Sequence, residues 1–255
     1  MTAKIIGLTE WFATAPGQYL LAWEREQFDL AVADLFGFNA LQLGLPELDA
    51  LQANRMPHRW LALPEVPVFA NDASTQQPTP RVALVTNAAA LPFPEGSLDL
   101  VVLPHTLEFS ADPHHVLREV ERVLVPEGRV VISGFNPASL WGFRQARGRL
   151  VGASQLYLPE AGDFIGPWRL RDWLRLLSFE LESDRFGCYR PAMHSEKWLN
   201  RYAWLDRAGA RWWPIFGAVY FVVAVKRVRG MRLLGPAWKP QRAATAAPVS
   251  VANRH

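Results

Sequence analysis

Apolar residues recur in short blocks along the chain, and their spacing predicts alternating helices and strands. Residues 17–37 have helical spacing and end at a glycine, with one apolar face formed by Leu20, Trp23, Phe28, Val32 and Leu35. Continuous apolar runs predict strands at residues 39–45, 59–65, 81–86, 98–103 and 129–135. Residues 46–54 are expected to form a short helix because Pro46 suits a first helical turn.

The centre of the chain has the clearest pattern. Asp112 is a good N-cap and Pro113 a good first residue for a helix that repeats apolar residues at Val116, Leu117, Val120, Val123 and Leu124. This helix lies between two continuously apolar strands. Such a succession predicts a parallel sheet that is covered on both faces.

The C-terminal half is less regular. Helices are predicted at residues 169–177 and 195–213, and strands at 178–187 and 218–228, whereas residues 70–80 are polar and predict a loop. We expect one domain over residues 1–226, with insertions at 136–168 and 190–213 that form a lid or contact substrate. Residues 227–255 are rich in Arg, then in Ala, Pro and Ser, and are expected to form a basic, mobile tail.

Composition narrows the classes of protein that remain. The 255 residues are 50% hydrophobic and carry a net charge of +3, so a globular domain is expected and the uniformly basic charge of a nucleic-acid-binding protein is absent. The single cysteine, Cys188, cannot form an internal disulfide. No signal peptide is recognised, and the longest apolar run, residues 214–225, is too short to span a bilayer. We therefore expect a soluble, cytoplasmic protein without a transmembrane segment.

Several motifs of the central block together resemble those of class I S-adenosylmethionine-dependent methyltransferases of the small-molecule type. They are, in order, "NAAALPF", "SLD", "LVVL", "LEF", "LREVERVL", "PEG" and "RVVISG", within residues 87–137, about a fifth of the chain. The resemblance implies a doubly wound, seven-stranded, mostly parallel α/β sheet with helices on both faces. It also implies that S-adenosylmethionine binds over the carboxyl ends of the first strands, where open α/β sheets bind ligands generally.

The resemblance carries over to individual residues. Gly44 takes the place of the first glycine in the family's Gly-rich loop, and Leu45 stands in that loop. The other positions implied to bind the cofactor are Gln42, Glu65 for the ribose, Asn87 for the adenine amino group, Ala88, Pro104 and His105. His105 follows the fourth strand, where substrate and methyl group meet, and a histidine there can act as a general base if the acceptor must lose a proton.

Each of these residues also has a purely structural interpretation. Gly44 can form a tight turn, Asn87 can cap local backbone, Glu65 can be a loop residue, and His105 can be a hydrogen-bonded residue at a strand end. His114 and His115 are adjacent on a helix and point in different directions, so no metal site is expected.

Three functions remain open. The first is methylation of a small or amphipathic molecule, with residues 140–150 or 198–213 near the substrate. The second is a methyltransferase-like binding or regulatory module without catalysis, which the degenerate turn "LGLPEL" favours. The third is RNA methylation, suggested by the basic tail. It is disfavoured because "LPHTLEF" replaces the Asn/Asp-Pro-Pro-Tyr type of motif after the fourth strand.

Overall fold

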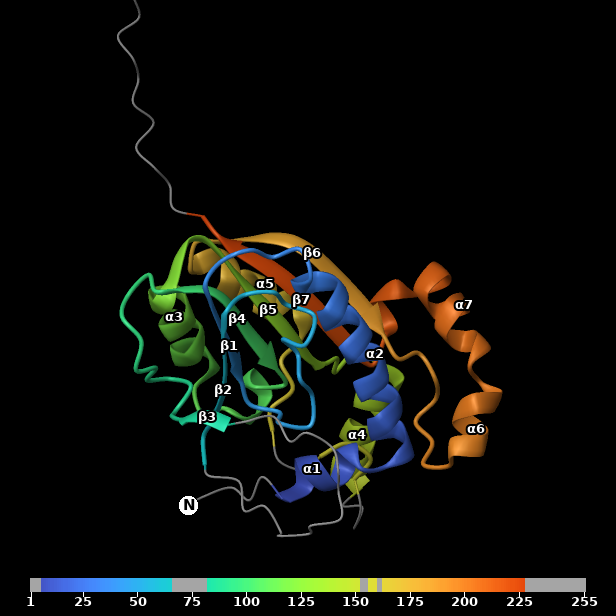
Figure 1. The fold of residues 1–255 in the computed structure, drawn as a ribbon. Coiled ribbons are helices and arrows are strands. Elements are labelled where there is room, and N and C mark those ends of the chain that lie inside the picture. The colour runs from blue at the N-terminus through green and yellow to red at the C-terminus, as the bar shows by residue number, and fades with distance from the viewer. Residues whose placement is uncertain (1–5, 66–81, 152–155, 160–161, 228–255) are drawn as a thin grey trace, which may run out of the picture.

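A seven-stranded sheet forms the centre of the computed structural model, which describes residues 6–65, 82–151, 156–159 and 162–227 (Figure 1). The strands are β1 (Asn39–Leu43), β2 (His58–Leu63), β3 (Val82–Val85), β4 (Leu98–Pro104), β5 (Leu124–Phe135), β6 (Phe179–Gly187) and β7 (Val219–Lys226). The predicted loop at 70–80, and the predicted tail from residue 228 on, lie outside the described residues.

The strand order is β3-β2-β1-β4-β5-β7-β6. Strands β1 to β5 pair in parallel, and β7 is antiparallel to both β5 and β6. The predicted doubly wound, mostly parallel sheet is thus confirmed. The order reverses between β1 and β4, and open α/β sheets place their ligand crevice at such a point, outside the carboxyl ends of the strands.

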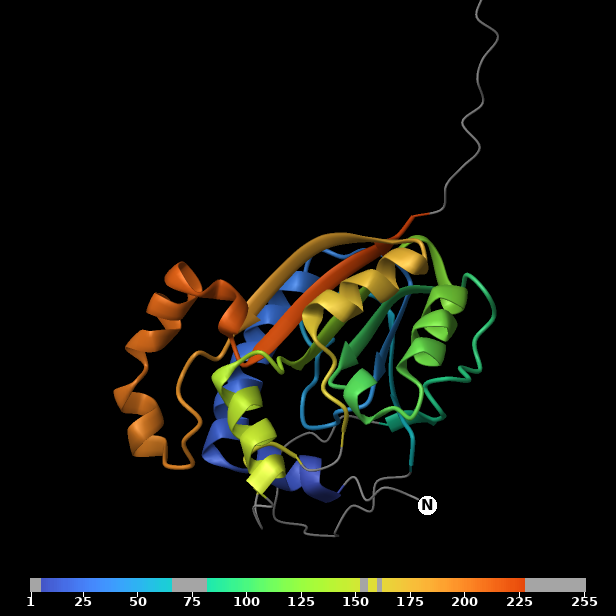
Figure 2. The same cartoon turned by 180° about the vertical axis from the view of Figure 1, so that it is seen from behind.

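Helices cover both faces of the sheet (Figure 2). They are α1 (Ile6–Phe12), α2 (Ala15–Val32), α3 (Pro113–Val123), α4 (Leu140–Val151), α5 (Pro167–Leu176), α6 (Glu196–Arg201) and α7 (Trp204–Trp212), with short 3₁₀ turns η1 (Leu107–Phe109) and η2 (Pro214–Phe216). Helices α1 and α2 pack on one face together with Trp141 of α4, whereas α3 and α5 pack on the other.

Successive side chains of a strand point to opposite faces of the sheet, so each strand contributes to the apolar cores on both faces. In β7, Phe221 points toward α2, where its ring meets Phe28 edge-on at 4.9 Å, and the neighbouring Val222 belongs to the core beneath α3 and α5. Helix α3 begins as its sequence predicts, because the Oδ1 of Asp112 accepts the backbone N–H of His115 at 3.0 Å.

Several elements differ from the sequence-based prediction. Helices α1 and α4 were not predicted, and α2 ends at Val32 instead of Gly37. Residues 46–54 form turns instead of a helix, because Leu45, Leu48 and Leu51 are all drawn into the core. Residues 195–213 divide into α6 and α7 rather than one helix. Strand β5 starts five residues earlier than predicted, since Leu124 pairs with Leu98 of β4 and Glu127 adopts a positive φ of 65°.

Helices long and apolar enough to cross a lipid bilayer are absent from the described part of the chain.

Candidate functional site

The predicted site residues gather at one edge of the sheet. The carboxyl ends of β1, β2, β3 and β4 share this edge because the four strands are parallel. Gly44 follows β1, Glu65 follows β2, Asn87 and Ala88 follow β3, and Pro104 ends β4 with His105 next to it. These residues therefore share one edge of the sheet, but the surroundings of the individual side chains differ widely.

The turn after β1 has two consecutive residues with positive φ. Gly44 has a φ of 78° and Leu45 a φ of 43°, and a left-handed backbone is unfavourable for a residue with a Cβ. Burial of the Leu45 side chain in the core beneath α2 offsets this strain. The N–H of Gly44 donates to the carbonyl of Ala62 in β2 at 2.9 Å, so it extends the sheet ladder. The side chain of Leu45 is thus not available to a ligand.

Gln42 holds this turn closed from within. Its Nε2 donates to the carbonyls of Gly44, Leu45 and Leu48 at 3.2, 3.0 and 2.6 Å. Its Oε1 accepts the N–H of Ala50 at 2.9 Å, and the side chain is buried. The expectation that Gln42 binds the cofactor is corrected by this geometry, because both ends of its amide are committed to the turn itself.

Thr106 closes the gap between the ends of β1 and β4. Its hydroxyl donates to the carbonyl of Leu43 at 2.5 Å. The same oxygen would lie 3.3 Å from a Cβ placed on Gly44. The turn is therefore packed on its Thr106 side and half-exposed at Gly44, Pro46 and Glu47. No local pattern in the sequence indicates this contact, because it joins residues 63 positions apart.

His105 lies between two carboxylates in the protein interior. Its Nδ1 is 2.9 Å from the Oε2 of Glu108. Its Nε2 is 3.0 Å from the Oε1 of Glu24 in α2, an ion-pair distance without the alignment of a straight hydrogen bond. The side chain is 0% exposed, so solvent and substrate have no direct access to the ring. This corrects the expectation that His105 is a general base and that it contacts cofactor, because both ring nitrogens face protein carboxylates.

The remaining contacts of Glu108 explain how it stays buried. Its Oε1 accepts the backbone N–H of Phe135. A Cβ on Gly134 would lie 2.9 Å from that same oxygen and 2.5 Å from the hydroxyl oxygen of Tyr220, so only glycine admits both groups. Proximity to Glu108 and burial raise the pKa of the Tyr220 hydroxyl, chiefly through burial.

Electrostatics fixes the charge state of the imidazole. Burial alone lowers the pKa of His105, but the carboxylates of Glu24 and Glu108 outweigh that effect and raise the pKa to about 10. Burial raises the pKa of Glu108, and the imidazolium opposes this rise. His105 is thus an imidazolium at neutral pH, a state that cannot accept a proton. Sequence reasoning did not connect Glu24 with this cluster, because the two lie 81 positions apart.

The ends of β2 and β3 are open by comparison. The side chain of Glu65 is exposed. Asn87 is also exposed, and its Oδ1 accepts the N–H of Ala89 at 2.9 Å, as in a local turn, which leaves a second lone pair on that oxygen. Ala88 is half-buried against the core beneath α3. This half of the edge therefore keeps polar groups within reach of a ligand.

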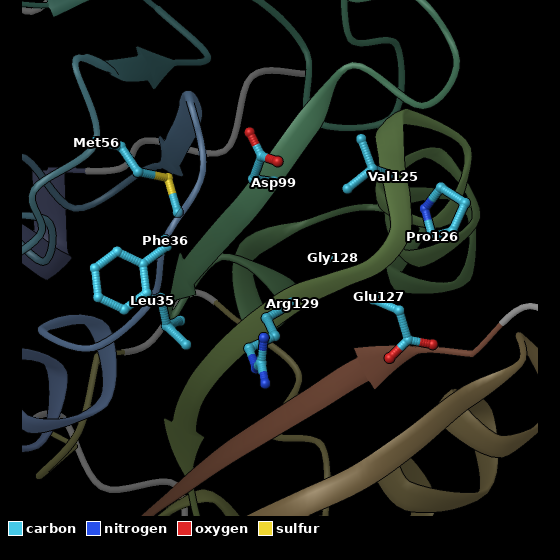
Figure 3. A pocket seen from close by; sticks show the side chains of 9 residues that line it. All are labelled: Leu35, Phe36, Met56, Asp99, Val125, Pro126, Glu127, Gly128 and Arg129. Atoms are coloured by element: carbon cyan, nitrogen blue, oxygen red, sulfur yellow. The ribbon is translucent and has the colours of Figure 1, made fainter.

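Two hollows lie elsewhere on the molecule. One of about 210 Å³ is at the opposite, amino-terminal edge of the sheet, beside Phe36, Asp99 and Glu127 (Figure 3). Its Asp99 already accepts the N–H groups of Phe38 and Asn39 at 2.8 and 2.9 Å, a structural role. The other, of about 390 Å³, lies between α2, β6 and η2, where Arg185 donates to Gln27 at 3.0 Å.

A family model described as a methyltransferase domain matches residues 51–132, from the turns before β2 to the middle of β5. The Escherichia coli K12 protein YafS is 38% identical over 138 residues, which are 54% of this chain and 52% of that protein. The demethylmenaquinone methyltransferase of Lactococcus lactis is 38% identical over 80 residues, 31% of this chain and 29% of that enzyme.

Among solved structures, the protein that forms a complex with the Trm112 methyltransferase activator of Haloferax volcanii aligns with a TM-score of 0.58 at 16% identity. The alignment covers 89% of this chain and 99% of that one. At this identity the likeness concerns the fold. The chain spans about half the length of the Escherichia coli relative and under a third of the Lactococcus enzyme.

Proposed function

Because the chain belongs to the class I S-adenosylmethionine-dependent methyltransferase family, we propose that it transfers a methyl group from S-adenosylmethionine to a small or amphipathic molecule. One observation carries this proposal. The segment that matches the methyltransferase model contains β2, β3 and β4, which are followed or ended by Glu65, Asn87 and Pro104. These residues lie at the same edge of the sheet as the carboxyl ends of β1 and β4, between which the strand order reverses.

The described residues fit one half of the cofactor better than the other. The exposed carboxylate of Glu65 would accept hydrogen bonds from the ribose hydroxyls, and the free lone pair on the Oδ1 of Asn87 would accept one from the adenine amino group. At the β1 turn, Gln42 and Leu45 are turned inward, and both backbone polar groups of Gly44 already have partners in Ala62 and Gln42. The half-exposed residues Pro46 and Glu47 are what this turn leaves for the methionine end. When bound, the cofactor supplies the reactive methyl group on its sulfonium.

The chain's own contribution would be placement and dehydration. An in-line methyl transfer depends above all on the approach of the acceptor, so rigid strand ends are more important than a base. Pro104 and Thr106 are held in place by the β4–β5 ladder and by the hydrogen bond from Thr106 to Leu43. An amphipathic acceptor is supported by the name of the Lactococcus relative, a demethylmenaquinone methyltransferase, and by exposed apolar side chains on α4, within the proposed lid at 136–168.

A second function is favoured by the closed β1 turn. No helix follows β1 within residues 44–57, and the carbonyls of Gly44, Leu45 and Leu48 are bound by Gln42. A family member without catalysis, acting as a binding or regulatory module, would need no opening at this turn. The two functions differ in whether the edge binds cofactor at all.

Calorimetric titration of the full chain with S-adenosylmethionine and with S-adenosylhomocysteine separates them. We expect both to bind, and Glu65→Gln to weaken binding about tenfold or more because a charge-assisted hydrogen bond is lost. Glu95→Gln is the matched control, since Glu95 is also exposed but precedes β4 at the opposite edge. Absence of binding at millimolar cofactor by folded protein would leave the non-catalytic module as the function.

A further inference from the structure

Exposed aromatic side chains concentrate on one appendage of the molecule, outside the proposed cofactor edge. Among the described residues, five tryptophans are exposed. Four of them lie in the appendage formed by α6, α7 and the residue that follows α7: Trp198, Trp204, Trp212 and Trp213. Ile215 and Phe216 of η2 continue this apolar surface. Figures 1 and 2 both place α6 and α7 at the side of the sheet farthest from α3 and β3. Such a concentration marks an interaction surface.

The contacts of α7 show which side faces outward. Asp206 and Gly209 face the body, because Asp206 accepts the Nε–H of Arg190 at 2.9 Å and a Cβ on Gly209 would lie 2.3 Å from the ring of Tyr189. The opposite side carries Trp204, Arg207 and Arg211 at spacings of three and seven, all exposed. One helical face therefore combines an indole with two guanidinium groups.

Helix α6 repeats this combination. Trp198 is 48% exposed, and the guanidinium of Arg201 lies 5.7 Å from its ring centroid. Exposed Lys197 adds a further cation beside Glu196. The appendage thus exposes four cations and one carboxylate, because its other acid, Asp206, is turned inward to Arg190.

We propose that the exposed surface of α6, α7 and η2 docks on an anionic phospholipid bilayer. This surface, the Trp/Arg face, is formed by Trp198, Arg201, Trp204, Arg207, Arg211, Ile215 and Phe216. Tryptophan prefers the boundary between headgroups and acyl chains, and arginine can bury its stem while its charge stays at the headgroups. The net positive charge favours anionic lipid and opposes pairing of two copies through the same face, since cations would meet cations. The proposal does not depend on methyl transfer.

Vesicle binding by the full chain tests the proposal. The double variant Trp204→Ser/Arg211→Gln removes an indole and a cation seven residues apart on α7. The matched control, Trp168→Ser/Arg175→Gln, removes the same pair at the same spacing on α5, where both residues are exposed. The two double variants therefore carry the same total charge, and both keep residues 228–255 intact.

We expect wild type to co-sediment with vesicles of phosphatidylcholine and phosphatidylglycerol better than with phosphatidylcholine alone, and less at high salt. The α7 variant should lose about tenfold in partitioning, and the α5 variant less than about twofold. Equal binding by both variants, or by both kinds of vesicle, would overturn the proposal. So would light scattering that shows a wild-type dimer dissolved by the α7 variant, because the face would then bind a second copy.

Discussion

At the scale of single residues, the largest expected loss of folding stability comes from substitutions in the buried group formed by His105, Glu24 and Glu108. Removing the imidazole would leave two carboxylates buried without their cation, and breaking a buried ion pair on one side costs about 3–5 kcal/mol. We therefore expect His105→Leu to lower the free energy of unfolding by about that amount in urea titrations. His115→Leu, at an exposed histidine of α3, is the control and should change it by less than about 0.5 kcal/mol.

The same group predicts a dependence of stability on pH. The pKa of His105 is raised to about 10 in the folded protein, above the value of about 6.5 expected when unfolded. The stabilisation is therefore complete below about pH 6.5 and is lost as pH rises toward 10. Between about pH 7 and pH 8, below ordinary thiol ionisation, the free energy of unfolding should fall by up to about 1.4 kcal/mol per pH unit. A slope that persists unchanged in His105→Leu would contradict this assignment.

Gln42 is the second buried polar residue whose loss should destabilise the protein, because its side chain binds the backbone of the turn after β1. Gln42→Leu would leave the carbonyls it binds, and the N–H of Ala50, without partners in the interior. We expect a loss of about 2–4 kcal/mol and faster hydrogen exchange across residues 44–54. Gln52→Leu changes an exposed residue of the same type in the same turns and should leave exchange unchanged. Unaltered exchange in Gln42→Leu would show that the turn is held by other contacts.

At the scale of elements, the amino ends of β1 and β4 are joined by one close approach. A Cβ on Gly37 would lie 2.5 Å from the Cβ and Cγ of Asp99, whose carboxylate accepts the N–H groups of Phe38 and Asn39. Gly37→Ala should thus cost about 1–3 kcal/mol in chemical denaturation. Gly166→Ala is the comparison, because its nearest atom would be 3.8 Å away and its φ is −65°. Equal stability of the two variants would contradict the clash.

Local signals explain which elements the sequence could predict. Helix α3 carries its own N-cap, proline and apolar period, so its existence follows from residues 112–124 alone. The turns at 46–54 do not follow from their own residues. Gln42 binds their backbone and their leucines enter the core, and these tertiary contacts override the helical pattern. For the same reason the sequence could place His105 after β4 but could not reveal that Glu24 faces it.

At the scale of the whole molecule, α6 and α7 are attached to the sheet through few polar contacts, and Asp206 is central to them. Its carboxylate accepts hydrogen bonds from the hydroxyl of Tyr19 in α2, the backbone N–H of Tyr189 at 3.2 Å and the Nε–H of Arg190 at 2.9 Å. One side chain thus connects α7 to α2 and to the segment after β6. Its loss should loosen the appendage without opening the core beneath α3 and α5.

Hydrogen exchange of Asp206→Asn distinguishes local from global loosening. The amide side chain keeps one acceptor oxygen but loses the charge that pairs with Arg190, so residues 190–213 should exchange about tenfold faster or more. Amides of β4 and β5 should keep their wild-type rates, because those strands pair at the centre of the sheet and share no contact with Asp206. Asp172→Asn, exposed on α5, should alter neither region. If the β4 and β5 amides accelerate together with 190–213, the appendage and the sheet unfold as one cooperative unit, and the Trp/Arg face is as rigid as the core that carries it.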